Sequence, residues 1–315
     1  MLSRVAESLF WIGRYVERAE DTARLLDVHF HEVLEDPTVD EEVACTVLLT
    51  VMGIPDDTAR QHRTSQSVLE LLGYDRDASN SIAGALIAAR QNARGAREAL
   101  SADLWECLNS TYNALPIRVT AARDFGPAPF FSYVRERAAT FAGHVEATMS
   151  RDASHDVLVL GRSLERVDMT ARLLAARIGA AGGNEHWTST LRACSAHDAY
   201  LRTYQQGVDA PRVLKFLLID RLFPRSVFYA LRVGEQALAR LDPVSGRSGL
   251  YEPARRAIGR ARTDLEFLSS DNLLDNLSER LHGLQRTVST VSEEVTQRLF
   301  AGSAPLRWSI EEPAA

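Results

Sequence analysis

Lysine is almost absent from this chain of 315 residues. Lys215 is the only lysine, and arginine side chains supply the remaining positive charge. Schiff-base chemistry and phosphate-loop chemistry both depend on a lysine side chain, so little room is left for either. Gly-x-Gly-x-x-Gly and P-loop patterns are missing as well, and independent nucleotide binding therefore has no support. The formal net charge of −6 argues against a general attraction to nucleic acid or to an anionic membrane.

Cysteine is scarce, with Cys45, Cys107 and Cys194 scattered along the chain. This number and spacing predict reduced thiols in the core of a cytoplasmic protein. No stretch approaches 18 consecutive apolar residues, so we predict no membrane span, and the amphipathic N-terminus argues against export. Runs of alternating polar and apolar residues are missing too, and the predicted fold class is therefore all-α.

The sequence also lacks the patterns of common catalytic centres. It has no His-Glu-x-x-His, no paired Cys-x-x-Cys and no Gly-x-Ser-x-Gly motif, so we expect no metal site and no cofactor. His29 and His31 are two residues apart and would face different sides of a helix. Asp152 precedes Ala153, Ser154 and His155 in the manner of a helix cap.

What the chain does contain is a repeat. Residues 12–26, IGRYVERAEDTARLL, return 148 residues later as residues 160–174, LGRSLERVDMTARLL. Nine of these fifteen positions are identical, whereas unrelated segments would share about one, and this agreement predicts a tandem duplication. The copies agree in their polar residues as much as in their apolar ones, as a shared site or a shared ion network would require.

Both copies have the apolar spacing of an amphipathic helix, with a buried seam at alternating intervals of three and four residues. The seam comprises Leu9, Ile12, Val16, Ala19, Ala23, Leu26 and Phe30, and then Val157, Leu160, Leu164, Val167, Ala171, Leu174 and Ile178. A second stripe lies beside it, formed by Gly13, Glu17, Glu20 and Arg24 in one copy and by Gly161, Glu165, Asp168 and Arg172 in the other. A glycine inside a helix is unfavourable, so we expect another segment to approach the backbone closely there.

Two interpretations of the charged stripes remain open. In the first, the two helices face each other and their arginines, Arg14, Arg18, Arg24, Arg162, Arg166 and Arg172, surround an anionic group, while Glu17 and Glu165 orient them or accept a proton. In the second, the same residues form ion pairs that fix the helix register. Glu17 and Glu165 are thus candidate catalytic residues, although nothing in the sequence shows that either is unpaired.

These residues resemble the alpha-E family, a bacterial all-helical domain that is typically duplicated and is named for a Glu-Arg motif. The motif would be Glu17-Arg18 and Glu165-Arg166, and the opening residues 1–20, MLSRVAESLFWIGRYVERAE, look like a family member throughout. The resemblance covers nearly the whole chain. It implies no established reaction, but it implies an association with circularly permuted ATP-grasp ligases, transglutaminase-like proteins and an N-terminal-nucleophile peptidase in a peptide synthesis or modification system.

A second group of arginines also resembles a signature of this family. Arg90, Arg94 and Arg97 lie on one predicted helical face, with Asn92 between them and Trp105 downstream. Like charges on one face repel, so the acids of the first helix are the simplest partners, and an anionic ligand or a partner protein is the alternative. In the second half, Arg225-Ser226 is predicted as a helix cap or, less simply, as a phosphate contact.

We divide the chain into a first helical repeat at residues 1–150, a second at 151–302 and a loose tail at 303–315. The expected helices of the first repeat span residues 3–34, 41–52, 67–72, 82–100 and 130–149. A further helix starts at residues 101–104 and is interrupted at Pro116 or at residues 125–129. Those of the second repeat span residues 154–178, 186–204 as one or two helices, 227–241, 253–268 and 272–300.

We therefore expect two related bundles packed as one body, without nucleic-acid or membrane partners. The favoured function is a non-catalytic or accessory component of a cytoplasmic peptide ligation or modification system, which binds a ligase or its substrate through arginine-rich surfaces. An enzyme that uses Glu17 and Glu165 on an arginine-held carboxylate or phosphate is one alternative. A purely structural interaction scaffold is another, and the sequence leaves the oligomeric state open.

Overall fold

A computed structural model describes residues 2–179, 184–241, 252–269 and 272–300 of the chain. Within these ranges the regular structure is entirely helical, which confirms the predicted all-α class. None of the described helices combines the length and the apolar character needed to cross a lipid bilayer. The predicted loose tail at 303–315 lies outside the described residues.

The first half of the chain is built around one long helix, α1, which spans Ser3–Glu35. After it come the short helices α2 (Glu41–Val51), α3 (Asp56–Ala59) and α4 (Ser65–Leu69), a π-helical turn η1 (Glu70–Tyr74), α5 (Ile82–Gly95), a 3-10 turn η2 (Arg97–Ala99), α6 (Ala102–Phe125) and α7 (Ala128–Thr148).

The second half has a similar order of elements around α8, which spans Ala153–Gly179. The helices that follow are α9 (Asn184–Ala193), α10 (His197–Tyr204), α11 (Ala210–Ile219), α12 (Val227–Leu241), α13 (Pro253–Glu266) and α14 (Leu277–Leu299). The predicted boundary at residues 150 and 151 falls in the connection between α7 and α8.

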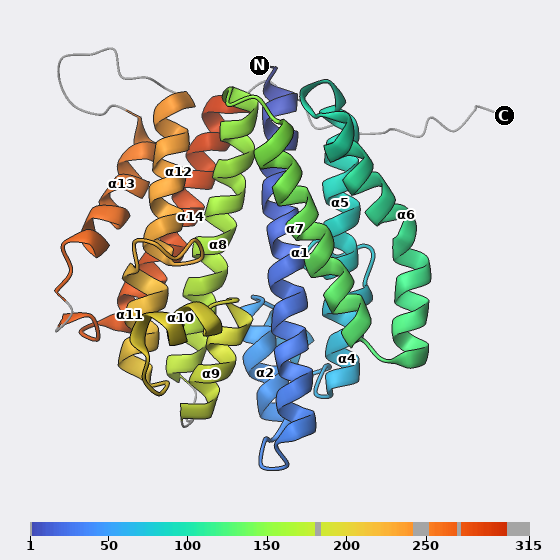
Figure 1. The fold of residues 1–315 in the computed structure, drawn as a ribbon, viewed down its shortest axis with the longest axis vertical. Helices are drawn as coiled ribbons and strands as arrows, with labels where there is room; N and C mark the ends of the chain where they lie inside the picture. Colours follow the sequence, from blue (N-terminus) through green and yellow to red (C-terminus); the bar gives the residue numbers. More distant parts are fainter. Residues whose placement is uncertain (1, 180–183, 242–251, 270–271, 301–315) are drawn as a thin grey trace.

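The two long helices α1 and α8 pack against each other at the centre of the molecule (Figure 1). Helices α5, α6 and α7 complete a bundle around α1, and α12, α13 and α14 complete one around α8. The short helices cross between the halves, because α2 contacts α8 as well as α1, and α9 contacts α1 as well as α8. The halves thus share one hydrophobic core. A tandem duplication remains our interpretation of the similar order of helices in the two halves.

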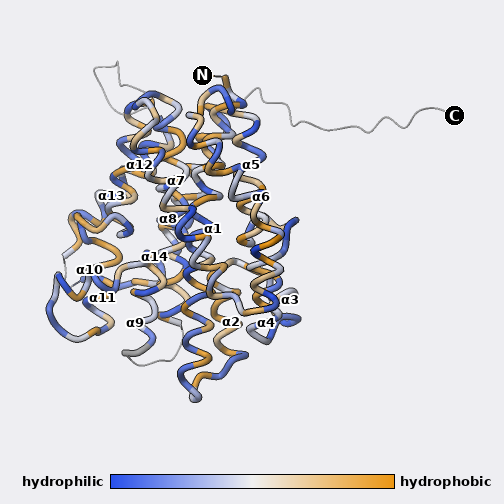
Figure 2. Tube along the Cα trace, turned by 45° about the vertical axis from the view of Figure 1, so that its right-hand side comes forward, coloured by the Kyte–Doolittle hydropathy of each residue, from blue (hydrophilic) through white to orange (hydrophobic). Residues whose placement is uncertain are grey.

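The apolar seam of each long helix is buried as predicted, apart from its C-terminal end. Residues from Leu9 to Leu26 and from Val157 to Leu174 at seam positions are all buried, whereas Ile178 is 38% exposed. Figure 2 shows hydrophobic and hydrophilic residues alternating along the helices, as expected when only one face of a helix enters the core.

Gly13 and Gly161 allow the backbones of α1 and α8 to touch. A Cβ atom on Gly13 would lie 2.2 Å from the carbonyl oxygen of Leu158, and one on Gly161 would lie 2.1 Å from the carbonyl oxygen of Phe10. Phe10 and Leu158 are themselves 148 residues apart, so the two contacts are reciprocal. The predicted close approach at these glycines is confirmed.

The helices of the structure can be compared with the sequence-based ones at several places. Of the two predicted interruptions, the one at Pro116 is wrong, because α6 continues through this residue, and the one at residues 125–129 is confirmed, because the helix ends at Phe125 and Gly126 follows with φ at +100°. Helix α5 stops at Gly95, short of the predicted residue 100. Helix α11 was not predicted, although Asp209 caps it by accepting a hydrogen bond from the backbone N–H of Arg212.

Candidate functional site

The crossing of α1 and α8 brings the two Glu-Arg segments together in the interior. Glu165 on α8 receives two arginines of α1, with Arg14 Nε 2.6 Å from Oε2 and Arg18 Nε 2.6 Å from Oε1. Arg18 also donates from Nη2 to Oε2 at 3.0 Å. A carboxylate held by two guanidinium groups is fully neutralised, which reduces the cost of burying it.

Glu17 on α1 has the corresponding partner on α8. Arg166 Nε lies 2.5 Å from Oε1 of Glu17, and its Nη2 donates to Oε2 at 3.0 Å. The arginine of each Glu-Arg pair therefore binds the glutamate of the other pair, an exchange that links the halves. A second arginine, Arg225, which directly precedes the cap of α12, lies 3.1 Å from Glu17.

Arg225 also serves two further acids of α1. Its Nη2 lies 2.7 Å from Glu20 Oε1, and its Nη1 lies 2.7 Å from Asp21 Oδ1. Glu20 in turn receives Arg24 at 2.7 Å. The first-half acids, Glu17, Glu20 and Asp21, thus share the buried guanidinium of Arg225, and we call this group the triple-acid cluster.

The equivalent positions on the α8 side of the crossing are simpler. Asp168, the counterpart of Glu20, pairs with Arg172 at 3.0 Å, but Met169 stands where the first half has Asp21. The residue before the α5 cap serine is Asn80, whereas the residue before the α12 cap serine is Arg225. Arg162, the counterpart of Arg14, lies 3.6 Å from Glu146.

Burial and charge act on these acids in opposite directions. Glu17 is 3% exposed and Glu165 is 1% exposed. Burial alone would raise the pKa of Glu17, but Arg166 and Arg225 outweigh it and bring the pKa to about 2. Burial opposes the ionisation of Glu165 as well, yet Arg18 and Arg14 hold its pKa below the usual value.

Asp21 behaves differently from these glutamates. Burial raises the pKa of Asp21 to about 7. The charge of Arg225 lowers this pKa only in part, because Arg225 also pairs with Glu17 and Glu20, and the negative charges of these two glutamates raise it further. A cavity of about 20 Å³ borders Asp21, Arg166, Thr170, Cys194 and Arg225, and it is large enough for one water molecule.

This arrangement limits what the cluster can do chemically. In the described part of the chain, Glu17 and Glu165 are each bound by two arginines and lie in a closed interior. A general base must come within hydrogen-bond reach of a substrate, which neither carboxylate can do in this arrangement. The arginines of the stripes likewise contact carboxylates of the chain itself. The geometry favours a network that fixes the register of α1 against α8.

The second predicted arginine group lies apart from this cluster, on α5 and the turn after it. Its expected pairing with the acids of α1 is wrong, because Trp105 draws these side chains toward α6. The guanidinium of Arg90 lies 5.4 Å and that of Arg97 lies 5.1 Å from the Trp105 ring centroid. Arg90 also donates to Asn109 at 3.2 Å, Asn92 donates to the carbonyl oxygen of Ala88, and Arg94 is exposed.

Several smaller predictions can be compared with the structure. Ser226 caps α12 by accepting from the backbone N–H of Tyr229, as predicted, whereas the pairing of Arg225 with three acids was not foreseen. His29 is buried and His31 is exposed, so they do face different sides. Asp152 accepts hydrogen bonds from the backbone N–H groups of Ser154 and His155 and caps α8. The three cysteines are free thiols, all buried.

The fold and this cluster define a class: an all-helical protein whose two halves are joined by exchanged Glu-Arg pairs. The chain belongs to the Alpha-E family, described as a predicted alpha-helical domain with a conserved ER motif, whose model matches residues 1–300. Glu17-Arg18 and Glu165-Arg166 both have the residues of such a motif.

Similar curated proteins are known from mycobacteria. An uncharacterized protein of Mycobacterium bovis and one of Mycobacterium tuberculosis are each 28% identical to this chain over 337 aligned residues. The alignment takes in 96% of this chain and 38% of each relative, so the chain spans well under half of their length. No solved structure matches the chain significantly.

Proposed function

We propose that this protein is a non-catalytic binding component of a cytoplasmic peptide synthesis or modification system, in which it works with an ATP-grasp-type ligase and a transglutaminase-like protein. The proposed partners rest on what membership of the family implies. In its mycobacterial relatives the region similar to this chain is one part of a longer polypeptide, an arrangement that suits a module acting beside another activity.

The observation that carries the binding role is the closed state of the Glu-Arg cluster. Its glutamates and arginines neutralise one another in the interior, so the most distinctive residues of the chain hold the halves together. A scaffold of this kind presents its outer helices in fixed positions, which favours recognition of a partner over chemistry on a substrate.

The arginine group of α5 is the best candidate for the contact with the ligase. Arg94 and Arg97 are exposed, and Arg97 stacks on Trp105, so this surface joins positive charge to a large aromatic ring. Tryptophan and arginine are enriched among the residues that dominate protein interfaces. We expect an acidic surface on the partner.

Affinity purification of the tagged chain from its native cells, followed by mass spectrometry, tests this function. We expect an ATP-grasp protein to be recovered with the wild-type chain and to be lost with the double variant Arg94→Glu/Arg97→Glu. The matched control is Arg256→Glu, at an exposed arginine of α13, which should leave recovery unchanged. Absence of any ATP-grasp protein from the wild-type sample would remove the proposed partnership.

A further inference from the structure

The surface formed by α5, η2 and the start of α6 carries positive charge that acids of the described residues do not balance. These helices lie at the edge of the molecule, on the side of α1 away from α8 (Figure 1). Arg90, Arg94 and Arg97 form no ion pair within the described part of the chain. At the crossing of α1 and α8, by contrast, every arginine of the two stripes contacts a carboxylate. The open charge is therefore a local feature of this surface.

Aromatic rings of α6 hold two of these guanidinium groups in place. The Cζ atom of Arg97 lies 5.1 Å and that of Arg90 lies 5.4 Å from the ring centroid of Trp105. Arg90 also lies 4.9 Å from the Tyr112 centroid, and its Nε donates to Asn109 at 3.2 Å. Stacking on a ring orients a guanidinium group and leaves N–H groups at its edge free to donate. We call Arg90, Arg97, Trp105 and Tyr112 the arginine-aromatic row.

The guanidinium groups beside Trp105 are close enough to bind one ligand together. The Cζ atoms of Arg90 and Arg97 cannot be more than about 10.5 Å apart, the sum of the distances 5.4 Å and 5.1 Å to the same centroid. In an extended peptide, alternate side chains point the same way and lie about 7 Å apart. Carboxylates on alternate residues of one peptide can therefore reach both arginines. Arg94, one turn along α5 from Arg90, is exposed and adds a third cation.

The corresponding surface of the second half is closed by acids. Counted from the serine that caps each helix, Arg90 of α5 corresponds to Glu235 of α12. Glu235 pairs with Arg262 of α13, which also pairs with Glu266. The same helical framework can thus balance its own charge at this place. Because the first half does not, the fold alone gives no reason for its open arginines.

The acids nearest to these arginines in the sequence do not close the surface. Glu98, Asp103 and Glu106 are exposed, and none forms an ion pair with another described residue. At about 100° per residue, Glu106 points about 100° and Asp103 about 160° away from Trp105 around α6. Glu98 directly follows Arg97, so it is the acid that an incoming carboxylate must approach.

We propose that the arginine-aromatic row, together with Arg94, binds a short linear segment of a partner protein in which acidic residues recur. The carboxylates of the segment would lie against the free edges of the Arg90 and Arg97 guanidinium groups, where charge and hydrogen bonding act together. The proposal deepens the proposed function by naming the element of the partner that is recognised. It rests on that function only in assigning the segment to a partner protein.

Other anions fit this surface less well. A nucleic-acid base would have to displace a guanidinium group in order to stack on Trp105. The net charge of −6 on the chain also disfavours a long polyanion. A compact anion such as pyrophosphate gains little from arginines spread along a row. A segment with spaced carboxylates uses the whole row.

The probe is hexaglutamate, acetylated and amidated so that only its side chains carry charge. We titrate it into the purified, 15N-labelled full chain and follow the indole N–H signal of Trp105 by NMR, assigned by its loss in Trp105→Phe. The signal should move saturably at millimolar peptide or below, and binding should weaken as salt is added. Hexaglutamine with the same end groups has the same length without the charge, and it should leave the signal unmoved.

Single variants test the contact from both directions. Arg97→Gln and Arg90→Gln should each weaken binding about fivefold, the factor for loss of one exposed charge pair. Glu98→Gln should strengthen it about twofold, because it removes a like charge. Arg118→Gln is the matched control and should change nothing, since Arg118 is an exposed arginine of α6 that stacks at 4.5 Å on Tyr133 of α7 instead. Arg97 and Glu98 are exposed, so their variants test the proposal even if the half-buried Arg90 proves necessary for folding.

An unmoved Trp105 signal, or equal binding of hexaglutamine, would overturn the proposal. Unchanged affinity in Arg97→Gln would overturn it too, and so would tighter binding of inorganic pyrophosphate or of single-stranded hexathymidylate at the same salt concentration. These outcomes are distinct from those of the proposed function. A chain that recovers an ATP-grasp protein from cells but does not bind hexaglutamate would leave the function standing and this inference wrong, whereas the reverse result would remove the ligase partnership alone.

Discussion

The triple-acid cluster and its counterpart in the second half occupy equivalent places beside the crossing of α1 and α8, yet they balance charge differently. On the α1 side, Glu17, Glu20 and Asp21 share Arg225 of the second half, whereas on the α8 side Met169 replaces the third acid and Asn80 of the first half stands at the place of the arginine. The extra acid and the extra arginine therefore occur together.

The Glu-Arg exchange is therefore common to both sides of the crossing, whereas the added acid and arginine belong to one side only. The exchanged pairs have similar geometry on both sides, with closest nitrogen–oxygen distances of 2.5 to 2.6 Å. Asp21 on the α1 side and Asp168 on the α8 side both have a raised pKa, chiefly because of burial, so neither side fully compensates for its acids.

The largest effect should come from removing the charge of Glu165. Glu165→Gln leaves Arg14 and Arg18 without a buried counter-charge, and arginine cannot lose its proton, so we expect a loss of about 3–5 kcal/mol in the free energy of unfolding. Glu17→Gln should cost less, because Arg225 retains Glu20 and Asp21. Urea unfolding followed by circular dichroism measures both, and equal losses would show that the two sides are balanced alike.

Arg225→Asn gives the second half the residue that the first half has at the same place, Asn80. We expect a loss near the lower end of the range for a broken buried pair, about 3 kcal/mol, because Asp21 can take up a proton when its partner is removed. Adding Asp21→Met completes the conversion and should restore about 1 kcal/mol or more. A double variant no more stable than Arg225→Asn would break the proposed link between these two positions.

The glycine contacts should respond equally in the two halves. Gly13→Ala and Gly161→Ala each place a methyl group against a backbone carbonyl of the facing helix, and overpacking of this kind costs about 1–3 kcal/mol. The same unfolding measurement compares them. Gly143→Ala on α7 is the control, because a Cβ there meets nothing within 4 Å, and it should stabilise the helix slightly.

The most gradual effect is a dependence on pH that Asp21 introduces. Its pKa in the folded state, about 7, lies above the ordinary value of 3.8, so the folded protein holds this proton more tightly than the unfolded chain does. The resulting stabilisation is complete below the ordinary pKa and is lost as pH rises through about 7, by at most about 1.4 kcal/mol per pH unit.

Asp21→Asn removes the titrating carboxyl group, so the difference in unfolding free energy between wild type and this variant isolates the contribution of Asp21. Stability curves of wild type and Asp21→Asn at a series of pH values should diverge between about pH 5 and pH 7, with wild type losing more on going to the higher pH. Glu17, whose pKa is lowered to about 2, acts only in acid and does not affect this window. Parallel curves would contradict the raised pKa of Asp21.

Sequence reasoning recovered the features that depend on one helix and its period. The seam, the stripe beside it and the need for close approach at Gly13 and Gly161 all follow from the spacing of residues within each copy. The partners of the charged residues depend instead on which helices meet and where their long side chains reach. For that reason Arg90 was assigned to the wrong acids, and the role of Arg225 was missed.

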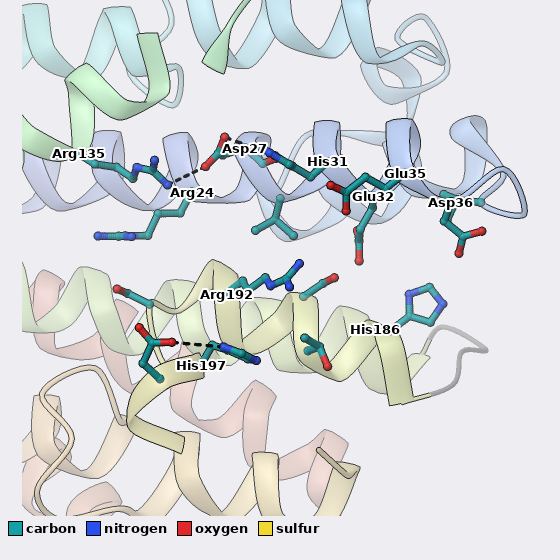
Figure 3. Close-up of a pocket in the computed structure, with 16 residues that line it drawn as sticks. Arg24, Asp27, His31, Glu32, Glu35, Asp36, Arg135, His186, Arg192 and His197 are labelled. Atoms are coloured by element: carbon teal, nitrogen blue, oxygen red, sulfur yellow. Dashed lines mark hydrogen bonds and ion pairs between the residues drawn. The ribbon is translucent and has the colours of Figure 1, made fainter. Parts of the chain in front are cut away.

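The cleft of about 720 Å³ between the C-terminal part of α1 and α9 was beyond sequence reasoning for a similar reason (Figure 3). Arg192 and Glu35 lie on helices from different halves, and neither belongs to the repeated motif. A signal for the enlarged acid cluster was present, however. Aligning the copies sets Asp21 against Met169, and the cap serines, Ser81 and Ser226, set Asn80 against Arg225. One copy thus gains an acid, Asp21, and the other gains an arginine, Arg225, and two such opposite changes indicate an ion pair between them.

The exchange of arginines between the Glu-Arg pairs also bears on how the molecule can come apart. Each half supplies the arginine of one exchanged salt bridge and the glutamate of the other, and α2 and α9 each contact the long helix of the opposite half. A polypeptide cut in the connection between Thr148 and Ala153 would therefore leave two fragments with unmatched charges on their inner faces. Mixed together, they should reassemble, whereas either one produced alone should lack the means to complete its own interior.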